Sequence, residues 1–305
     1  MLDYHLHLWP HDERATPLNL DQLAAYCEKA QAAGVQELAV TEHLFRFRQA
    51  EALLGGFWSD DRVPAALQAS MADYWDFHAT ADLDAYVRCA QEAKDAGLPV
   101  VIGLEVDFYR GRMDEVAGLL AGYPFDVLLG SVHWLDAWRF DDIDVPLQMD
   151  EWSAREVDDC WDQYTVALEE LAASGACDVL AHPDLIKVAG YVPDAPDEWW
   201  DRMAEAAASS GMAAELSSAG WRKPVGEQYP ALPLLERFAA RGVPFTTASD
   251  AHRHEQVADR AADLRSLLEA VGVEALQGYE GRVPHRVAVG SPPPLSPVAG
   301  LGEEG

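Results

Sequence analysis

Short apolar stretches alternate with longer amphipathic ones along most of the chain. The short stretches are rich in Val, Leu and Ala, which is typical of strands that are buried on both faces of a parallel sheet. We expect strands at 2–6, 37–40, 100–103, 127–130, 179–181, 213–216 and 244–247. Strands that alternate with helices predict a parallel α/β fold, and both a barrel and an open sheet fit this pattern.

The stretches between the predicted strands have apolar residues at helical spacing and recognisable end signals. One helix is expected to begin after Asn19, a residue type that caps helix N-termini, and to stop at Gly34. Asp82 and Gly97 repeat these signals around a second helix. Further helices are expected at 153–175, 197–211, 231–242 and 259–272.

Two segments depart from the alternation. Residues 46–78 begin "RFRQAEALLGGFWSDDRVPAALQ" and predict an inserted loop or a small helical excursion over one end of the fold. The end of the chain, "VGSPPPLSPVAGLGEEG", is rich in Pro, Gly and Ser, a composition typical of disorder. We therefore predict one domain over residues 1–285 and a disordered tail over 286–305.

Composition narrows the classes of partner. The net charge of −30 makes nucleic acid an unlikely partner, because such a surface repels phosphate backbones. A small phosphorylated substrate would need cations at the site to reverse this field. The four cysteines form no CxxC pair, and we find neither a signal peptide nor an apolar run of membrane-spanning length. We expect a cytoplasmic protein without a membrane partner; the sequence does not indicate an oligomeric state.

Histidines gather where the predicted strands end. Ligands of parallel α/β folds bind at the carboxyl ends of the strands, and seven of the ten histidines lie there: His5, His7, His11, His43, His133, His182 and His252. Glu105 and Asp250 occupy matching positions. Histidine and carboxylate are the usual ligands of Zn, Mn and Fe, and residues i and i+2 of a strand face the same side. The pattern therefore predicts a multinuclear metal site.

The remaining polar residues at these strand ends have weaker signals. Asp107 and Asp184 are candidates for orienting a ligating imidazole, although a helix-capping role fits each of them equally well. We interpret the other three histidines, His78, His254 and His285, as structural.

In chain order, the motifs HLH (5–7), TEH (41–43), GLEVDF (103–108), GSVH (130–133), AHPD (181–184) and SDAH (249–252) resemble the polymerase and histidinol phosphatase (PHP) superfamily. The likeness covers roughly residues 1 to 285. The segments "ELSSAGWRKPVGEQYP", "FDVLLGSVHWLD" and "WRFDD" are most similar to the PHP-type histidinol-phosphatases.

This resemblance implies a distorted (β/α)7 barrel, similar to a TIM barrel, that holds two or three divalent metal ions, either Zn, Mn or Fe. By the same resemblance, the first metal is held by His5, His7, Glu105 and Asp250, the second by Glu105, His133 and His182, and the third by His11, His43 and His252. Arg222 is implied to bind the phosphate, with Lys223 as a second candidate. His11 follows His7 more closely than the family pattern has it, so Asp12 competes for its place.

The hypothesis that follows is a phosphomonoesterase that hydrolyses L-histidinol phosphate by attack of a metal-bound hydroxide. Glu105, Asp250 and His252 are the candidate catalytic residues, with Asp250, His252 or a water as the proton donor. Alternatives are a PHP phosphoesterase for another small phosphate or nucleotide, an amidohydrolase-type enzyme, and a metal-binding regulatory module without turnover. The excursion at 46–78 and the tryptophan-rich stretch at 197–202 are candidates for reshaping the substrate pocket.

Overall fold

The computed structural model describes residues 1–289. Within them the chain forms one seven-stranded parallel sheet in sequential order and a separate two-stranded antiparallel hairpin. The strands of the sheet are β1 (Leu2–Asp3), β2 (Glu37–Val40), β3 (Val100–Asp107), β4 (Val127–Ser131), β5 (Val179–Leu180), β6 (Ala213–Ser217) and β7 (Phe245–Ala248). All seven predicted strands are confirmed, with ends shifted by a few residues.

Backbone hydrogen bonds between the first and last strands curl this sheet into a barrel. Tyr4 N donates to Thr247 O at 2.9 Å, and beyond the strand ends Asp250 N donates to His5 O at 2.7 Å. The residues that follow β1 continue in the same direction, since Leu6 forms a parallel bridge with Ala251. The predicted distorted (β/α)7 barrel is therefore confirmed, and the pattern's other option, an open sheet, is excluded.

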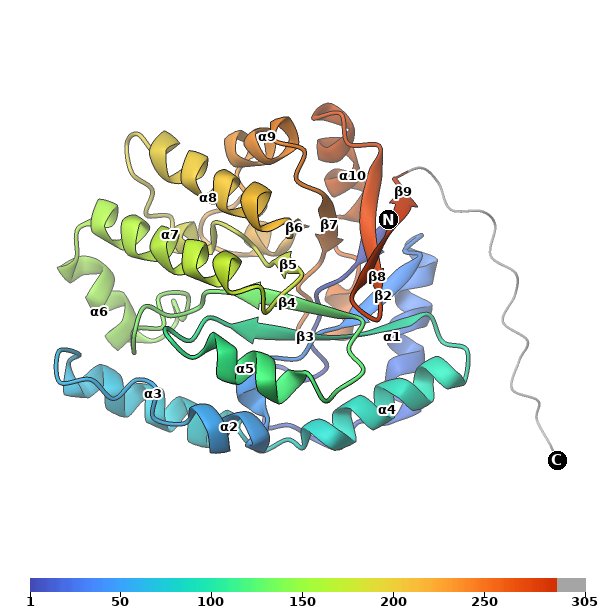
Figure 1. Ribbon diagram of the computed structural model, residues 1–305, viewed down its shortest axis with the longest axis horizontal. Coiled ribbons are helices and arrows are strands. Elements are labelled where there is room, and N and C mark those ends of the chain that lie inside the picture. The colour runs from blue at the N-terminus through green and yellow to red at the C-terminus, as the bar shows by residue number, and fades with distance from the viewer. Residues whose placement is uncertain (290–305) are drawn as a thin grey trace.

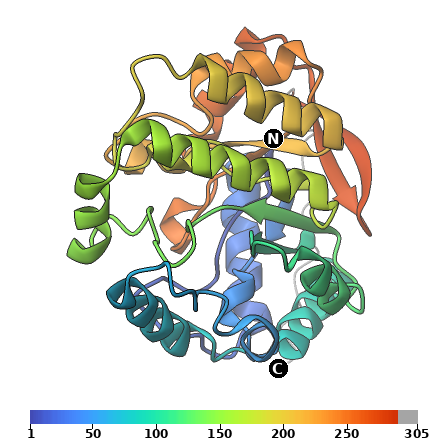
Figure 2. The ribbon, with the colours of Figure 1, turned by 60° about the vertical axis from the view of Figure 1, so that its left-hand side comes forward.

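Helices cover the outside of the barrel (Figure 1). They are α1 (Leu20–Ala32), α2 (Arg48–Leu54), α3 (Ala65–His78), α4 (Leu83–Asp95), α5 (Met113–Leu120), α6 (Pro146–Ala154), α7 (Val157–Ser174), α8 (Asp197–Ser210), α9 (Leu232–Ala240) and α10 (Ala261–Ala270). Single 3₁₀ turns are η1 (Leu44–Arg46), η2 (Leu185–Lys187), η3 (Ala219–Arg222) and η4 (His254–Gln256). Helices α7 and α8 run side by side along one flank (Figures 1 and 2).

The predicted helix ends are largely confirmed. Asn19 accepts a hydrogen bond from Gln22 N, and Asp82 accepts one from Ala85 N, so both act as N-caps. The helix expected at 153–175 is confirmed as α7, but it begins later than expected, because the chain breaks at Arg155 between α6 and α7. Arg155 leaves the helix with an extended backbone and places its guanidinium 4.5 Å from the ring centroid of Trp138.

The excursion at 46–78 is helical and consists mainly of α2 and α3. In Figure 1 strands β3 and β4 point to the left, and α3 and α6 lie on that side. The hairpin of β8 (Ala275–Glu280) and β9 (Val283–Ala288) lies on the opposite side and was not predicted. It runs a few residues past the expected domain boundary at 285, and residues 290–305 of the expected tail lie outside the described part of the chain.

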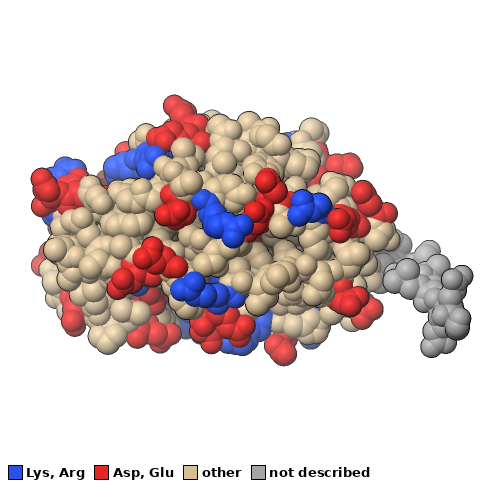
Figure 3. Space-filling view, turned by 90° about the horizontal axis from the view of Figure 1, so that it is seen from below, with Lys and Arg blue, Asp and Glu red and all other residues tan. Residues whose placement is uncertain are grey.

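Acidic and basic side chains are interspersed on the face shown in Figure 3. Many acidic groups lie near the edge of this view, and the basic groups that it shows are scattered among them. This face thus carries no continuous basic track of the kind that binds nucleic acid.

Candidate metal centre

The predicted metal ligands meet at the carboxyl ends of the strands. Glu105 lies on β3, inside the barrel, and pairs with His43 through a parallel backbone bridge. His5 and His7 extend from β1 as residues i and i+2, and their rings meet with centroids 5.1 Å apart. The side chains of His5, His7 and Glu105 are fully buried. The alternation of side chains along an extended chain thus places both imidazoles on the inner side.

Glu105 is the centre of this cluster. Its Oε2 lies 2.7 Å from His43 Nδ1, 3.2 Å from His5 Nε2 and 3.5 Å from His7 Nε2. Its Oε1 lies 3.1 Å from His182 Nε2 and 3.4 Å from His133 Nε2. The two oxygens of one carboxylate therefore face two different sets of imidazoles, which is the arrangement needed to bridge two cations.

Side chains of this cluster form overlapping groups whose ligand atoms lie within 4.8 Å of one another. Among the described residues these groups are His5–His7–Asp250, His5–Glu105–His182, His7–His43–His252 and His43–Asp107–His133. Each group offers nitrogen and oxygen donors of the kinds that Zn, Mn and Fe accept.

Carboxylates behind the imidazoles fix the orientation of the rings. His5 Nδ1 lies 2.8 Å from Glu215 Oε2, and His133 Nδ1 lies 2.6 Å from Asp107 Oδ1. An Nδ1–H that donates to a carboxylate leaves the Nε2 lone pair free to face the centre of the cluster. The predicted orienting role of Asp107 is confirmed by this contact. Glu215 was not predicted, although its place at an inward position of β6 is a usable signal.

A second carboxylate that the sequence analysis missed is Glu42, which precedes His43. Its Oε1 accepts hydrogen bonds from the backbone of Leu8 and Trp9, and its Oε2 lies 3.7 Å from His7 Nδ1. Glu42 thereby ties the loop after β1 to the end of β2. Since this loop carries His11, the contact helps to place that residue.

Charges inside the cluster suit bound cations. Burial would raise the pKa of Glu105, but the surrounding imidazoles of His5, His43 and His133 hold it well below its usual range. Burial would lower the pKa of His133, yet Glu105 and Asp107 raise it to about 10. Among residues 1–289, buried Glu105 Oε2 and His252 Nε2 have no hydrogen-bond partner. Orphaned acceptor atoms that converge in this way fit divalent cations.

The structure distinguishes between His11 and Asp12 as the residue that lies at the cluster. His11 Nε2 lies 3.3 Å from His43 Nε2, and its ring centroid lies 4.3 Å from that of His252. Asp12 points away and pairs with Arg253 at 3.0 Å. The structure therefore brings His11, rather than Asp12, to the cluster.

Arg222 lies beside the cluster, but its guanidinium already donates hydrogen bonds to other groups of the protein. Its guanidinium donates to Ser249 O at 2.7 Å, to Asp250 O at 3.0 Å and to Asp259 Oδ2 at 2.9 Å. The side chain of Lys223 makes no hydrogen bond or ion pair within residues 1–289, and its charge contributes to lowering the pKa of His252 after burial and the neighbouring imidazoles. Of the two, Lys223 holds the uncommitted positive charge.

Asp184 does not contact an imidazole, so the orienting role considered for it is wrong. Its carboxylate accepts a hydrogen bond from Ala231 N at 2.8 Å and pairs with the buried Lys187 at 2.9 Å. The residue follows His182 by two positions, but the chain turns into η2 there, which points the side chain away from the centre.

The three histidines interpreted as structural lie outside the groups described above. His78 packs between Tyr74 and Phe45, with ring centroids 4.3 and 5.5 Å away. His254 contacts Ala25 O, and His285 Nε2 lies 2.8 Å from a carboxylate oxygen of Glu37. Their structural interpretation is consistent with these contacts.

The two segments expected to reshape the pocket differ. Within the excursion, Phe57 lines a cavity beside Trp134, and just before the excursion the Phe45 ring stacks on His43 with centroids 4.6 Å apart. The tryptophan-rich stretch instead begins α8 on the outside of the barrel, where Trp199 meets Trp161 at 6.2 Å and Trp200 packs under Arg237. The expectation that residues 197–202 reshape the pocket is therefore wrong.

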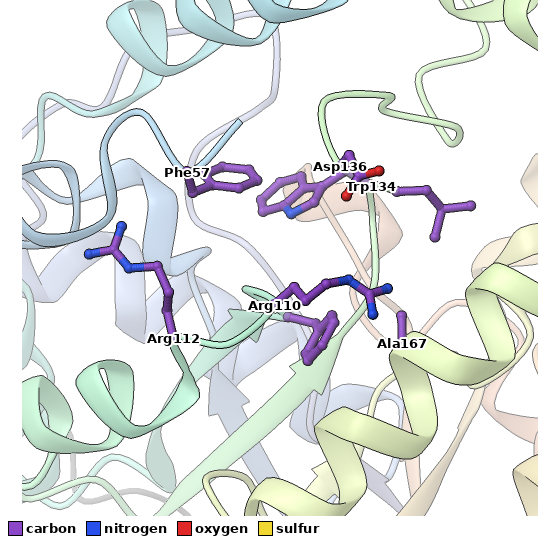
Figure 4. Close-up of a pocket in the computed structure, with 8 residues that line it drawn as sticks. Phe57, Arg110, Arg112, Trp134, Asp136 and Ala167 are labelled. Carbon is purple, nitrogen blue, oxygen red and sulfur yellow. The ribbon is translucent and has the colours of Figure 1, made fainter. Parts of the chain in front are cut away.

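A small cavity of about 70 Å³ lies next to the cluster, between the excursion and the loops after β3 and β4 (Figure 4). Trp134, the neighbour of His133, lines it together with Phe57, Arg110, Arg112 and Asp136. Both guanidiniums already face carboxylates, Arg110 that of Glu170 and Arg112 that of Glu115. The cavity thus adds aromatic surface beside the cluster, and Asp136 is the lining charge that has no ion pair within residues 1–289.

Comparison with known proteins fits this geometry. The family model "PHP domain" matches residues 5–219, which include most of the cluster. The chain belongs to the PHP family. This PHP domain is 36% identical over 189 residues to a Deinococcus radiodurans protein named "Probable histidinol-phosphatase", a match that covers 62% of this chain and 71% of that protein.

Solved structures share the fold of this PHP domain. Histidinol phosphate phosphatase from Lactococcus lactis, complexed with Zn, L-histidinol and phosphate, matches with a TM-score of 0.64 and 18% identity over 93% of this chain and 98% of that one. A Listeria monocytogenes protein described as a histidinol phosphatase matches with a TM-score of 0.65 and 18% identity over 86% and 99% of the two chains. In the described part of this PHP domain, no helix combines the length and apolar character needed to cross a membrane.

Proposed function

We propose that this PHP domain is a metal-dependent phosphomonoesterase and that its substrate is L-histidinol phosphate. The observation that carries the proposal is Glu105, whose two oxygens face separate sets of imidazoles within 3.5 Å. The match to the Deinococcus radiodurans relative supports the choice of substrate.

In the proposed site, each group of ligands has its own cation. His5, His7 and Asp250 would hold the first, together with Glu105. Glu105 would also serve the second, which His133 and His182 would complete. His11, His43 and His252 would hold the third. Distances among these side chains support the grouping, since His7 Nε2 and Asp250 Oδ1 are 3.4 Å apart and His43 Nε2 and His11 Nε2 are 3.3 Å apart.

When bound, divalent cations supply charge that neutralises the phosphate and lower the pKa of a water that can attack phosphorus. The chain's own residues position the reactants. Glu215 and Asp107 lock the rings of His5 and His133, so the cluster is preorganised. Lys223 adds a free positive charge at the mouth, and Arg222 reaches the phosphate by exchanging one of its present hydrogen bonds.

The leaving alcohol needs a proton, and two groups of the cluster lie near its opening. The side chains of Asp250 and His252 are 16% and 24% exposed, whereas Glu105 is fully buried. An alcohol that departs toward solvent passes these two groups. Burial would raise the pKa of Asp250, but the imidazoles of His5, His7 and His252 hold it well below its usual range, and burial lowers the pKa of His252. We therefore propose that both residues position a water that supplies the proton, and that Glu105 only holds cations.

The test is phosphate release from L-histidinol phosphate by protein loaded with Mn or Zn, beside a panel of other phosphomonoesters and nucleotides. We expect a kcat/KM of about 10⁴ M⁻¹s⁻¹ or more on L-histidinol phosphate, well above the rest of the panel. Turnover of other esters alone would reassign the substrate. Silence across the panel with cations bound would refute the enzymatic proposal and favour a regulatory metal-binding module.

A further inference from the structure

Tyr229 has a buried hydroxyl that bonds to nothing in the described chain. The side chain is 1% exposed, and Oη has no hydrogen-bond partner among residues 1–289. Burying a hydroxyl without a partner is unfavourable, so such groups are rare and need an explanation. By contrast, buried Tyr86 Oη lies 2.8 Å from Val40 O and 2.9 Å from Gly103 O and is satisfied.

Tyr229 lies against the metal centre. Its ring meets His182 edge-on, with centroids 6.3 Å apart, and Lys187 Nζ lies 5.3 Å from the ring centroid. Burial, followed by the charges of Asp184, Asp250 and Asp141, raises the pKa of the phenol well above its usual value. The hydroxyl therefore remains protonated at neutral pH and is available as a donor.

The surrounding loop holds the ring firmly. Ser217 N donates to Tyr229 O at 2.6 Å, and Tyr229 N donates to Ser217 O at 3.0 Å, which pins Tyr229 to the end of β6. A Cβ on Gly220 would lie 3.1 Å from Cε2 and Cζ of this ring and 2.1 Å from Glu227 O. Only glycine lets η3 pack so closely there, and η3 is the turn that ends in Arg222.

We propose that Tyr229 is a substrate-contacting residue, whose hydroxyl donates a hydrogen bond to an oxygen of the phosphoryl group held at the metal centre. This rests on the function proposed above and adds a neutral donor to it. Tyr229 and Arg222 belong to one rigid loop, so both reach the phosphate from the same side. No proton is transferred in this contact; the donor stabilises negative charge on phosphate oxygen.

The direct test is Tyr229→Phe, which removes only the oxygen. We expect kcat/KM for L-histidinol phosphate to fall about 10- to 100-fold, the usual effect of one hydrogen bond to a charged group. The affinity of the metal-loaded protein for inorganic phosphate, measured by titration calorimetry, should fall about tenfold. Metal content and Tm should not fall, because the hydroxyl makes no bond within the described protein.

Tyr279→Phe is the matched control, since it removes a satisfied hydroxyl that bonds to Asp178 O at 3.1 Å, at the opposite end of the barrel. It should lower Tm while phosphate affinity and kcat/KM stay at the wild-type values. If Tyr229→Phe also lowers Tm and leaves phosphate affinity unchanged, the hydroxyl has a structural role and the proposal is overturned.

Failure of this inference is distinguishable from failure of the proposed function. A wild-type protein that hydrolyses no phosphate ester would refute the function, while the phosphate titration still compares wild type with Tyr229→Phe. A crystal structure of the wild type with metal and phosphate gives a second measurement. We expect Tyr229 Oη within about 3.2 Å of a phosphate oxygen; a hydroxyl turned away from phosphate would overturn the contact.

Discussion

Buried polar side chains at the two ends of this barrel differ in whether they have hydrogen-bond partners. At the carboxyl ends of the strands, Glu105 Oε2, Asp107 Oδ2 and Tyr229 Oη are buried without a hydrogen-bond partner in the described chain. At the other end, Asp126 accepts hydrogen bonds from Ile102 N and Gly281 N, both at 2.9 Å, and pairs with Lys94.

The hairpin of β8 and β9 completes this second set of bonds. Its Arg282 pairs with Asp178 at 2.9 Å, and its Tyr279 N donates to Tyr4 Oη at 3.0 Å. Satisfied buried polar groups stabilise a fold, whereas unsatisfied ones cost stability unless a ligand completes them. The difference teaches that one end of the barrel is built for stability and the other for binding.

Glu105→Gln, at the carboxyl ends of the strands, should have the largest effect on activity. An amide can neither carry the negative charge nor bridge two cations, so we expect kcat/KM to fall by about 10³-fold or more. The Tm of the metal-free variant should stay within about 4 °C of wild type, because the amide fills the same space. Steady-state kinetics and calorimetry check this. A variant that works at full rate would refute the bridging role.

Removal of cations should affect only the cluster at the carboxyl ends of the strands. Chelation should abolish hydrolysis and lower Tm by about 5–10 °C, since cations at 100 times their Kd contribute about 2.7 kcal/mol. Scanning calorimetry with and without chelator measures the shift. Asp126→Ala serves as the control, and its shift on chelation should equal that of the wild type. Equal Tm values for loaded and chelated protein would contradict a cation site.

Asp126→Ala should destabilise the other end of the barrel, which the hairpin of β8 and β9 covers. The change leaves the buried Ile102 N without an acceptor and also removes the bonds to Gly281 N and Lys94, so we expect a loss of about 3 kcal/mol in the free energy of unfolding. The kcat/KM of the folded variant should remain that of the wild type. Denaturant unfolding measures the loss. Asp263→Ala, which removes an exposed pair with Arg260, is the matched control and should cost less than about 0.5 kcal/mol.

The smallest predicted effect is on KM, and it distinguishes two aromatic side chains, Phe45 and Trp199. Phe45→Leu removes the ring that stacks on His43, and we expect KM to rise about 3- to 10-fold because a metal ligand loses its support. Trp199→Leu, on the side of α8 that packs against Trp161, should leave KM unchanged. Michaelis curves for both variants decide this. A rise in KM for Trp199→Leu would mean that α8 reaches the substrate.

Much of this fold was predictable because its strands are buried on both faces. Such strands appear as unbroken apolar runs, and each of the seven runs became a strand. The hairpin at 275–288 was missed because β9 buries only Val287 and therefore shows no apolar run. The break at Arg155 was missed for a related reason, since its partner, Trp138, is distant in the sequence.

The site shows the same contrast. The positions of the candidate ligands were predictable because histidines are scarce and follow strands whose carboxyl ends meet at one end of a barrel. The role of Glu42 was not predictable, because the chain is rich in carboxylates and only the three-dimensional packing selects it, whereas the inward position of Glu215 on β6 was a usable signal. Arg222 was expected to face phosphate directly, and no feature of the sequence indicates that the backbone of Ser249 and Asp250 engages its guanidinium.

The closure of β1 on β7 has a consequence for biosynthesis. At ordinary rates of translation, His5 and His7 are synthesised roughly 10–50 s before Asp250 and His252. Until Asp250 and His252 are made, the nascent chain holds only an incomplete, histidine-rich half-site. The proposed cation site can therefore be completed only once β7 has been made, when this last strand of the sheet both closes the barrel and brings the last candidate ligands.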